Sequence, residues 1–105
     1  MIKNRLSRKA REKLVENTLT AQELKIIKDK YKNCVYCGKD KELTYEHIIS
    51  IRKGGNNSFY NIVRACLGCN SSKGTKDVAV WCKSKGISIP KCIIQNLKKL
   101  GEKNG

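Results

Sequence analysis

The chain has 105 residues and a formal charge of +14 at pH 7, because 23 lysine and arginine side chains stand against only 9 aspartate and glutamate side chains. This length fits one domain, whose core is marginal unless a metal ion or disulfides reinforce it. No apolar run is long enough to span a membrane, which argues against an integral membrane protein, and the charge predicts a polyanionic partner, in first place nucleic acid.

The first segment, residues 2–15, has apolar side chains at four-residue intervals, at Ile2, Leu6, Ala10 and Leu14. This spacing predicts a helix with a narrow apolar stripe, and most of its other positions are basic. Such a helix could lie along the phosphates of a nucleic acid and release their counterions, or it could be an ordinary solvated helix. It is also the one segment whose shape suits binding to a membrane surface.

The next helix is predicted to begin at residues 20–23, which read Thr-Ala-Gln-Glu, the capping-box pattern. Leu24, Ile27 and Tyr31 then mark one face of a helix that runs to about Lys32. This helix leads into the first of two cysteine pairs.

The two pairs are Cys34-x-x-Cys37 and Cys66-x-x-Cys69, and thiolates at this spacing can hold one tetrahedral zinc ion. Six cysteines in a short chain could instead form the disulfides of a secreted protein. However, residues 1–17 lack the apolar body of a secretory signal, and thiols in a reducing cytosol bind metal rather than pair. The sequence therefore predicts a structural zinc ion in a cytoplasmic protein.

A hairpin is predicted between the cysteine pairs. The first pair forms a knuckle over residues 34–40, where Gly38 supplies the unusual backbone angle of a tight turn. Alternating apolar residues predict a strand over residues 43–51, with the odd-numbered side chains, His47 among them, on one face.

A loop is predicted at residues 54–58, which read Gly-Gly-Asn-Asn-Ser. Residues 61–65 are predicted as a second strand that returns to the zinc site. A short helix should follow Cys66 and carry Asn70 and Lys73.

Two more helices are predicted after the second cysteine pair. Asp77 can cap a helix over residues 78–85, which Gly86 ends, and Pro90 can open another that ends before Gly101. The buried face of the last helix should consist of four apolar residues, Ile93, Ile94, Leu97 and Leu100. Three residues of these helices are predicted in the core and not as ligands, namely Trp81, Cys82 and Cys92.

Taken together, the motifs of residues 31–76 resemble an HNH endonuclease. They are, in chain order, Cys34-x-x-Cys37, Glu46-His47-Ile48, Gly54-Gly55, Asn61-Ile62-Val63, Cys66-x-x-Cys69-Asn70 and Lys73. Each motif alone is weak, and their order and spacing carry the resemblance. It points to the four-cysteine zinc subgroup, in a variant with asparagine in place of the last histidine.

The resemblance implies an α+β fold with a small zinc-stapled ββα-metal core and flanking N- and C-terminal helices. The 105 residues would then form one domain with three parts. These are a basic helical region at residues 1–30, the HNH nuclease core at residues 31–76 and C-terminal helices at residues 77–105.

The resemblance also implies roles for single residues. His47 matches the histidine that activates water as general base, and Asn61 matches the central asparagine, which braces the loop and orients that base. Glu46 matches the acidic ligand of the catalytic divalent ion, and Asn70 stands where many members have a histidine as second ligand. The ligands of the structural zinc ion would be Cys34, Cys37, Cys66 and Cys69.

The residue types also suit this chemistry by themselves. An imidazole can take a proton from water near neutral pH, and Mg²⁺ or Mn²⁺ can neutralise the charge that grows on the phosphate and the departing oxygen. Because Glu46 and Asn70 offer oxygen ligands, they favour Mg²⁺ or Mn²⁺ over Ni²⁺ or Zn²⁺. Neighbours in an ideal strand point to opposite faces. Glu46 and His47 can therefore both face the phosphate only if the strand bends or ends near residue 46.

The leading functional hypothesis is an HNH endonuclease that nicks or cuts DNA by hydrolysis. Arg52, Lys53, Lys73 and Lys76 are predicted to touch backbone phosphates, although each could be only solvated charge. The chief alternative is a zinc-stabilised nucleic-acid-binding module without catalytic activity. A thiol redox protein is a third hypothesis, which the two separated cysteine pairs disfavour.

The partners follow from the same hypothesis. DNA is the expected partner, and no membrane partner is expected. A chain this short leaves little room for a recognition domain, which suggests weak specificity, a homodimer or a larger targeting partner. Small members of the family occur in phages, mobile elements and restriction systems, and the sequence does not choose among them.

Overall fold

The computed structural model describes residues 17–104. In chain order these residues form helix α2 (Ala21–Lys30), strands β1 (Leu43–His47) and β2 (Ile62–Cys66), and helices α3 (Leu67–Lys73), α4 (Val78–Lys85) and α5 (Lys91–Asn104). Two short 3-10 turns, Ile51–Lys53 and Phe59–Asn61, lie between the strands. The helix predicted at residues 2–15 falls outside the described residues. The succession of two strands and a helix in the middle confirms the predicted ββα core.

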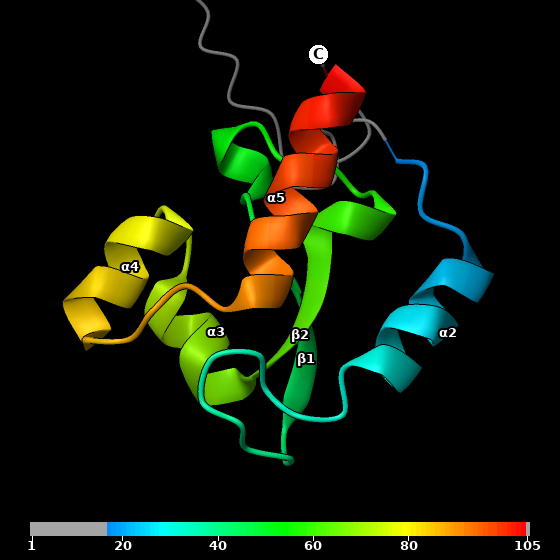
Figure 1. Ribbon diagram of the computed structural model, residues 1–105. Helices are drawn as coiled ribbons and strands as arrows, with labels where there is room; N and C mark the ends of the chain where they lie inside the picture. The colour runs from blue at the N-terminus through cyan, green and yellow to red at the C-terminus, as the bar shows by residue number, and fades with distance from the viewer. Residues whose placement is uncertain (1–16, 105) are drawn as a thin grey trace, which may run out of the picture.

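The hairpin lies in the centre of the described residues, with helices around it (Figure 1). β1 and β2 are antiparallel, and their register runs from Leu43 opposite Cys66 to His47 opposite Ile62. α3 follows directly from β2, and Figure 1 shows α3 and α4 on one side of the hairpin and α2 on the other. α5 packs on the 3-10 turn at Phe59–Asn61. The end of β1 also lies close to this turn, because the N–H of Ile48 donates to the backbone oxygen of Asn61 at 2.8 Å.

The start of α2 is the capping box that the sequence predicts. Thr20 Oγ1 accepts a hydrogen bond from the backbone N–H of Glu23 at 3.1 Å, and Glu23 Oε1 accepts one from the N–H of Thr20 at 3.0 Å. The helix ends at Lys30, close to the predicted end. It contributes Ile27 and, at its C-cap, Tyr31 to the core.

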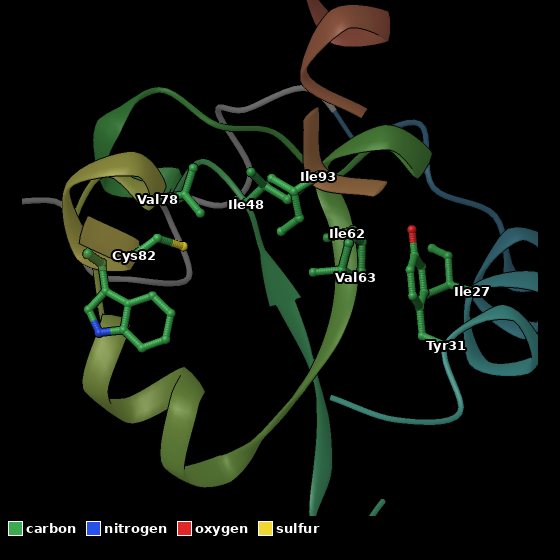
Figure 2. Close-up of a cluster of buried hydrophobic side chains, with 9 residues drawn as sticks. Ile27, Tyr31, Ile48, Ile62, Val63, Val78, Cys82 and Ile93 are labelled. Carbon is green, nitrogen blue, oxygen red and sulfur yellow. The ribbon is translucent and has the colours of Figure 1, made fainter. Parts of the chain in front are cut away.

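One apolar cluster joins the helices to the hairpin. Figure 2 shows that its side chains come from α2, from α4 and α5, and from β2 between them. The buried members are Ile27, Tyr31, Ile48, Ile62, Val63, Val78, Trp81, Cys82 and Ile93. Full burial of one large apolar side chain stabilises a fold by roughly 1.5–3 kcal/mol, so this shared cluster holds the hairpin and three helices in one arrangement.

Trp81 of α4 lies in the core, as predicted, with 3% of its surface exposed. Its ring meets the ring of Tyr36 edge to face, with the centroids 4.9 Å apart and the planes at 74°. Its Nε1 donates to Ser72 Oγ in α3 at 3.0 Å. Cys82 is also buried, as predicted, whereas Cys92 is only partly buried.

β1 is shorter than the strand predicted for residues 43–51, since it ends at His47. Beyond that point the side chain of Asn61 binds the backbone of Ile49, accepting from its N–H and donating to its carbonyl oxygen, each at 2.9 Å. The apolar alternation misled the prediction because Ile49 packs against the core from a turn and not from a strand. β1 ends at His47, near residue 46 as expected, but Glu46 and His47 both keep their places in the register and so point to opposite faces.

α4 forms as predicted. Asp77 Oδ1 accepts hydrogen bonds from the N–H groups of Ala79 at 2.9 Å and Val80 at 3.1 Å, and Gly86 ends the helix with a φ of 72°. The carboxylate satisfies two of the amides that a helix start leaves without partners.

α5 differs from its prediction at two positions. The helix continues through Gly101, where a glycine costs about 1 kcal/mol relative to alanine without forcing an end. The prediction that Ile94 is buried is wrong, because 43% of its surface is exposed, while Ile93 and Leu100 on the neighbouring face are buried. No helix of residues 17–104 is both long enough and apolar enough to cross a membrane.

Candidate active site and metal centre

The four predicted zinc ligands come together at the open end of the hairpin. The Sγ atoms of Cys34, Cys37, Cys66 and Cys69 all lie within 4.8 Å of one another. Those of Cys37 and Cys66 are 3.7 Å apart, close to the edge of about 3.8 Å in a tetrahedron with metal–sulfur bonds of about 2.3 Å. Gly38 closes the first knuckle with a φ of 82°, as predicted. The cluster fits a tetrahedral metal ion such as zinc.

Backbone amides support thiolates in this cluster. Cys34 Sγ accepts from the N–H groups of Tyr36 and Cys37, and Cys66 Sγ accepts from the N–H of Cys69, each at 3.4 Å. The hydrogen bond from Cys69 lowers the pKa of Cys66, whereas burial and the neighbouring thiols raise the pKa of Cys69. A thiolate, and not a thiol, is the form that binds a metal ion.

The facing sides of β1 and α3 bring together the residues predicted to bind the catalytic ion. Asn70 and Lys73 are three residues apart in α3 and share a helix face, and Thr44 and Glu46 are two residues apart in β1 and share a strand face. Asn70 Nδ2 donates to Thr44 Oγ1 at 2.8 Å, and Thr44 Oγ1 donates to Ala65 O at 3.0 Å. Because Nδ2 is engaged, Oδ1 is the Asn70 atom that could bind a cation.

Glu46 lies between β1 and α3 with only 3% of its surface exposed. Its Oε2 accepts a hydrogen bond from Tyr36 OH at 2.6 Å. Its Oε1 has no hydrogen-bond partner and lies 3.4 Å from Lys73 Nζ. Lys73 is itself fully buried, and its ammonium also donates to the backbone oxygen of His47 at 3.3 Å. An ammonium group thus lies beside the carboxylate that was predicted to bind a divalent ion.

The electrostatics of Glu46 combine burial with two partners. Burial raises the pKa of Glu46, whereas the hydrogen bond from Tyr36 and the charge of Lys73 lower it. Burial and the Glu46 charge raise the pKa of Tyr36, so the phenol remains a donor. A buried carboxylate oxygen without a hydrogen bond suits a hard divalent cation. Glu46 and Asn70 each offer one oxygen atom, from β1 and from α3, and Lys73 Nζ lies 3.4 Å from the Glu46 oxygen.

His47 follows Glu46 directly, so its side chain lies on the other face of β1. Its Nε2 is 2.6 Å from Oδ1 of Asn57, and the ring is partly buried. Asn57 belongs to the loop between the strands, and its backbone oxygen accepts from the N–H groups of Thr18 at 2.9 Å and Leu19 at 3.1 Å. The imidazole therefore has a partner that is itself fixed by the segment before α2.

Asn61 is buried and binds the turn after β1 to the loop between the strands. Besides its two bonds to Ile49, its Nδ2 donates to the backbone oxygen of Asn56 at 2.9 Å. A Cβ on Gly55 would lie 1.8 Å from the Ile49 oxygen and 2.9 Å from Asn61 Nδ2, so only glycine allows this close approach. This geometry agrees with the bracing predicted for the central asparagine.

The four predicted phosphate contacts do not share one environment. Arg52, Lys53 and Lys76 are exposed, and Lys53 and Lys76 line one cavity of about 360 Å³ between the turn after β1 and the start of α4. Lys73 differs from expectation, because it is buried against Glu46 and does not reach this surface.

Three residues of the site were not singled out from the sequence. Thr44 could have been found, because it lies two residues before Glu46 on the same strand face. Tyr36 occupies one of the two variable positions of the first Cys-x-x-Cys motif, and the motif assigns a role only to its cysteines. Asn57 gave no signal of its own, since asparagine is common in loops.

Residues 34–80 match the family model described as HNH endonuclease. The predicted resemblance is confirmed. This HNH segment contains the cysteine cluster, the contacts between β1 and α3, and the loop that carries Asn57. It ends inside α4, so Trp81 and all residues after it lie outside the match.

Two relatives extend the comparison. Over 67 residues the chain is 31% identical to the CRISPR-associated endonuclease Cas9 of Corynebacterium diphtheriae, which covers 57% of this chain and 6% of that protein. The crystal structure of the Type II-C Cas9 enzyme from Actinomyces naeslundii is similar with a TM-score of 0.53 and 26% identity, over 79% of this chain and 10% of that one. The chain thus spans a small fraction of the length of these relatives.

Proposed function

We propose that this chain is a metal-dependent HNH endonuclease that hydrolyses phosphodiester bonds in DNA. The observation that carries the proposal is the end of β1, where a buried carboxylate, Glu46, is followed directly by an imidazole with a fixed partner, His47. Both lie in the segment that matches HNH endonucleases, and the relatives are named as endonucleases or Cas9 enzymes.

Each proposed role follows from position. Glu46 Oε1 and Asn70 Oδ1 would hold one Mg²⁺ or Mn²⁺ ion, which supplies positive charge to the phosphate and to the departing 3′ oxygen. His47 takes a proton from the attacking water as general base. Asn61 keeps the turn after β1 in place and so orients His47. Zinc bound by the four cysteines ties the first knuckle to α3 and holds α3 against β1.

The proposed contacts to DNA phosphates are the exposed side chains of Arg52, Lys53 and Lys76. Lys73 could contact a phosphate only if its ammonium group moved away from Glu46. We further propose that the protein acts in the cytoplasm, where reducing conditions keep the four thiols available for zinc. A second copy of the chain or a larger partner would supply sequence targeting.

A zinc-stabilised nucleic-acid-binding module without catalytic activity is the second candidate. One observation favours it, namely that Lys73 Nζ, 3.4 Å from Glu46 Oε1, already neutralises the proposed metal ligand. Both candidates predict one zinc ion per chain and salt-sensitive binding to nucleic acid. They differ in whether the phosphodiester bond is cleaved.

Plasmid nicking separates the two candidates. The zinc-loaded protein should nick supercoiled DNA with Mg²⁺ or Mn²⁺ and less well with Ni²⁺. Removal of a general base costs about 10²–10⁴-fold, so His47→Ala should lose nicking while it still binds DNA. Binding without nicking by the wild type would favour the second candidate. Equal nicking by the wild type and His47→Ala would reveal a contaminating nuclease or a wrong base assignment.

A further inference from the structure

We propose that Asn57 is a positioning residue that keeps the proton of His47 on Nε2 and thereby leaves Nδ1 as the nitrogen that takes a proton from water. The role of Nδ1 rests on the proposed endonuclease activity. The hydrogen bond between the two side chains does not depend on that activity.

The geometry decides which ring nitrogen carries the proton. Nε2 of His47 is 2.6 Å from Oδ1 of Asn57. An amide oxygen only accepts hydrogen bonds, so a contact this short requires an N–H on Nε2. A neutral imidazole has a single N–H, and Nδ1 therefore holds the free lone pair. The other tautomer would place two lone pairs against each other.

Asn57 can impose this choice because its own backbone is fixed from outside the loop. Its carbonyl oxygen accepts hydrogen bonds from Thr18 N at 2.9 Å and Leu19 N at 3.1 Å, and the residue pairs with Asn17 in an isolated bridge. The preceding residue is held by Asn61 Nδ2, which donates to the backbone oxygen of Asn56 at 2.9 Å. The side chain of Asn57 thus extends from two anchored peptide groups.

The two tautomers are not equivalent for the proposed reaction. A general base must offer its lone pair to the water at the moment of attack. Without the Asn57 acceptor both tautomers become populated, and the ring also loses its fixed orientation. We expect a fall in kcat of about tenfold or more, because loss of the group that orients a catalytic histidine is costly in other hydrolases. Affinity for DNA should not change.

The experiment uses the fact that the chain has one histidine, so a long-range ¹H–¹⁵N correlation spectrum reports on His47 without assignment. The zinc-loaded full chain is measured at about pH 8, where imidazoles are neutral. The wild type should show the Nε2-protonated tautomer, and Asn57→Ala should show a mixture. Asn57→Asp, which retains an oxygen acceptor, should keep Nε2 protonated. In nicking assays Asn57→Ala should lose kcat with unchanged DNA binding.

An Nδ1-protonated wild type, or an unchanged tautomer in Asn57→Ala, would overturn the proposal. Should Asn57→Ala fail to retain zinc, the spectra of the wild type and Asn57→Asp decide the question. Absence of nicking in every protein would refute the proposed function and leave the tautomer result intact. The predicted tautomers without any effect on kcat would refute the positioning role alone.

Discussion

At the scale of single residues, the most consequential contact is the buried pair of Lys73 and Glu46. A lysine with no exposed surface loses the hydration of its charge, and its ammonium is compensated here by one carboxylate and by the backbone oxygen of His47. The same ammonium therefore links the two residues at the end of β1 to the last turn of α3. This contact couples stability to the geometry of the candidate site.

Removal of the Lys73 charge should destabilise the protein. Lys73→Met leaves Glu46 buried without its cation, and loss of one partner of a buried pair costs about 3–5 kcal/mol. Lys76→Met is the control, because Lys76 is exposed and such substitutions change stability by about 0.5 kcal/mol or less. Urea unfolding with excess zinc, followed by circular dichroism, measures both. The double variant Lys73→Met/Glu46→Gln should recover much of the loss, and equal effects of the two single variants would contradict the argument.

Tyr36→Phe should change the pH dependence of divalent-ion binding. Burial raises the pKa of Glu46 and the hydrogen bond from Tyr36 lowers it, so removal of the phenol raises this pKa further. Because the ion binds ionised Glu46, binding is lost as pH falls through the pKa, and this loss should occur at higher pH in the variant. Electron paramagnetic resonance of free Mn²⁺ across pH measures the shift. Tyr45→Phe, at an exposed tyrosine of β1, should behave as the wild type.

The residues that form the site differed in how far the sequence revealed them. His47, Glu46, Asn61 and Asn70 could be selected because they belong to ordered motifs. The contact of Lys73 with Glu46 could not be predicted, because it depends on how α3 packs against β1. That packing is set in three dimensions and leaves no trace in local spacing.

At the scale of secondary-structure elements, the turn after β1 determines where the site lies. Helices with clear caps, such as α2 and α4, were predicted almost to the residue, because side chains close in sequence define their ends. The end of β1 was not, because the turn after it is held by Asn61, which binds Ile49 from 12 residues further along the chain. Long-range hydrogen bonds of this kind override an apolar alternation.

Two glycines should respond in opposite directions to alanine. Gly55→Ala forces a Cβ against the Ile49 oxygen at 1.8 Å, so the loop must move, and overpacking of this kind costs about 1–3 kcal/mol. Gly101→Ala meets open space within α5 and should stabilise by about 0.5–1 kcal/mol. Thermal unfolding of the two variants tests the pair. If Gly55→Ala left the thermal stability unchanged, the loop would be able to adopt another backbone conformation, which would contradict the argument.

Removal of zinc should unfold the HNH segment. The cysteine cluster joins the first knuckle to β2 and α3, and structural zinc supplies on the order of 10–16 kcal/mol of apparent binding energy in small domains. Cys37→Ser should lose the metal and most of the helical circular dichroism. Cys92→Ser, outside the cluster, should retain one zinc ion per chain by elemental analysis. A chelator-treated wild type that keeps its spectrum would refute the structural role of the metal.

At the scale of the whole molecule, charge dominates. A formal charge of +14 on 105 residues cannot be balanced within the chain, and among residues 17–104 the surface ion pairs are few and exposed, such as Lys39 with Glu42 and Lys99 with Glu102. Exposed pairs contribute little to stability. The excess charge is therefore available to a polyanion, which agrees with the proposed DNA substrate.

Binding to DNA should weaken steeply with salt. Each neutralised phosphate contributes about −0.9 to the slope of log K against log salt, so neutralising Arg52, Lys53 and Lys76 together should flatten the slope by roughly 3. The matched control replaces Lys39, Lys85 and Lys99 with glutamine and removes the same charge from other elements. A filter-binding assay over a series of salt concentrations measures the slope for both variants. Equal flattening by the two sets would indicate diffuse attraction without a defined phosphate track.

The edge-to-face contact of Trp81 with Tyr36 gives the protein an optical reporter. Trp81 is the one tryptophan of the chain, and the hydroxyl of the ring it touches donates to Glu46. A cation that binds Glu46 should change the hydrogen bond from the Tyr36 hydroxyl to that carboxylate, and with it the surroundings of the indole. Indole emission should therefore change on titration with Mg²⁺, and binding of the ion beside Glu46 can be followed without DNA, without a label and before any bond is cut.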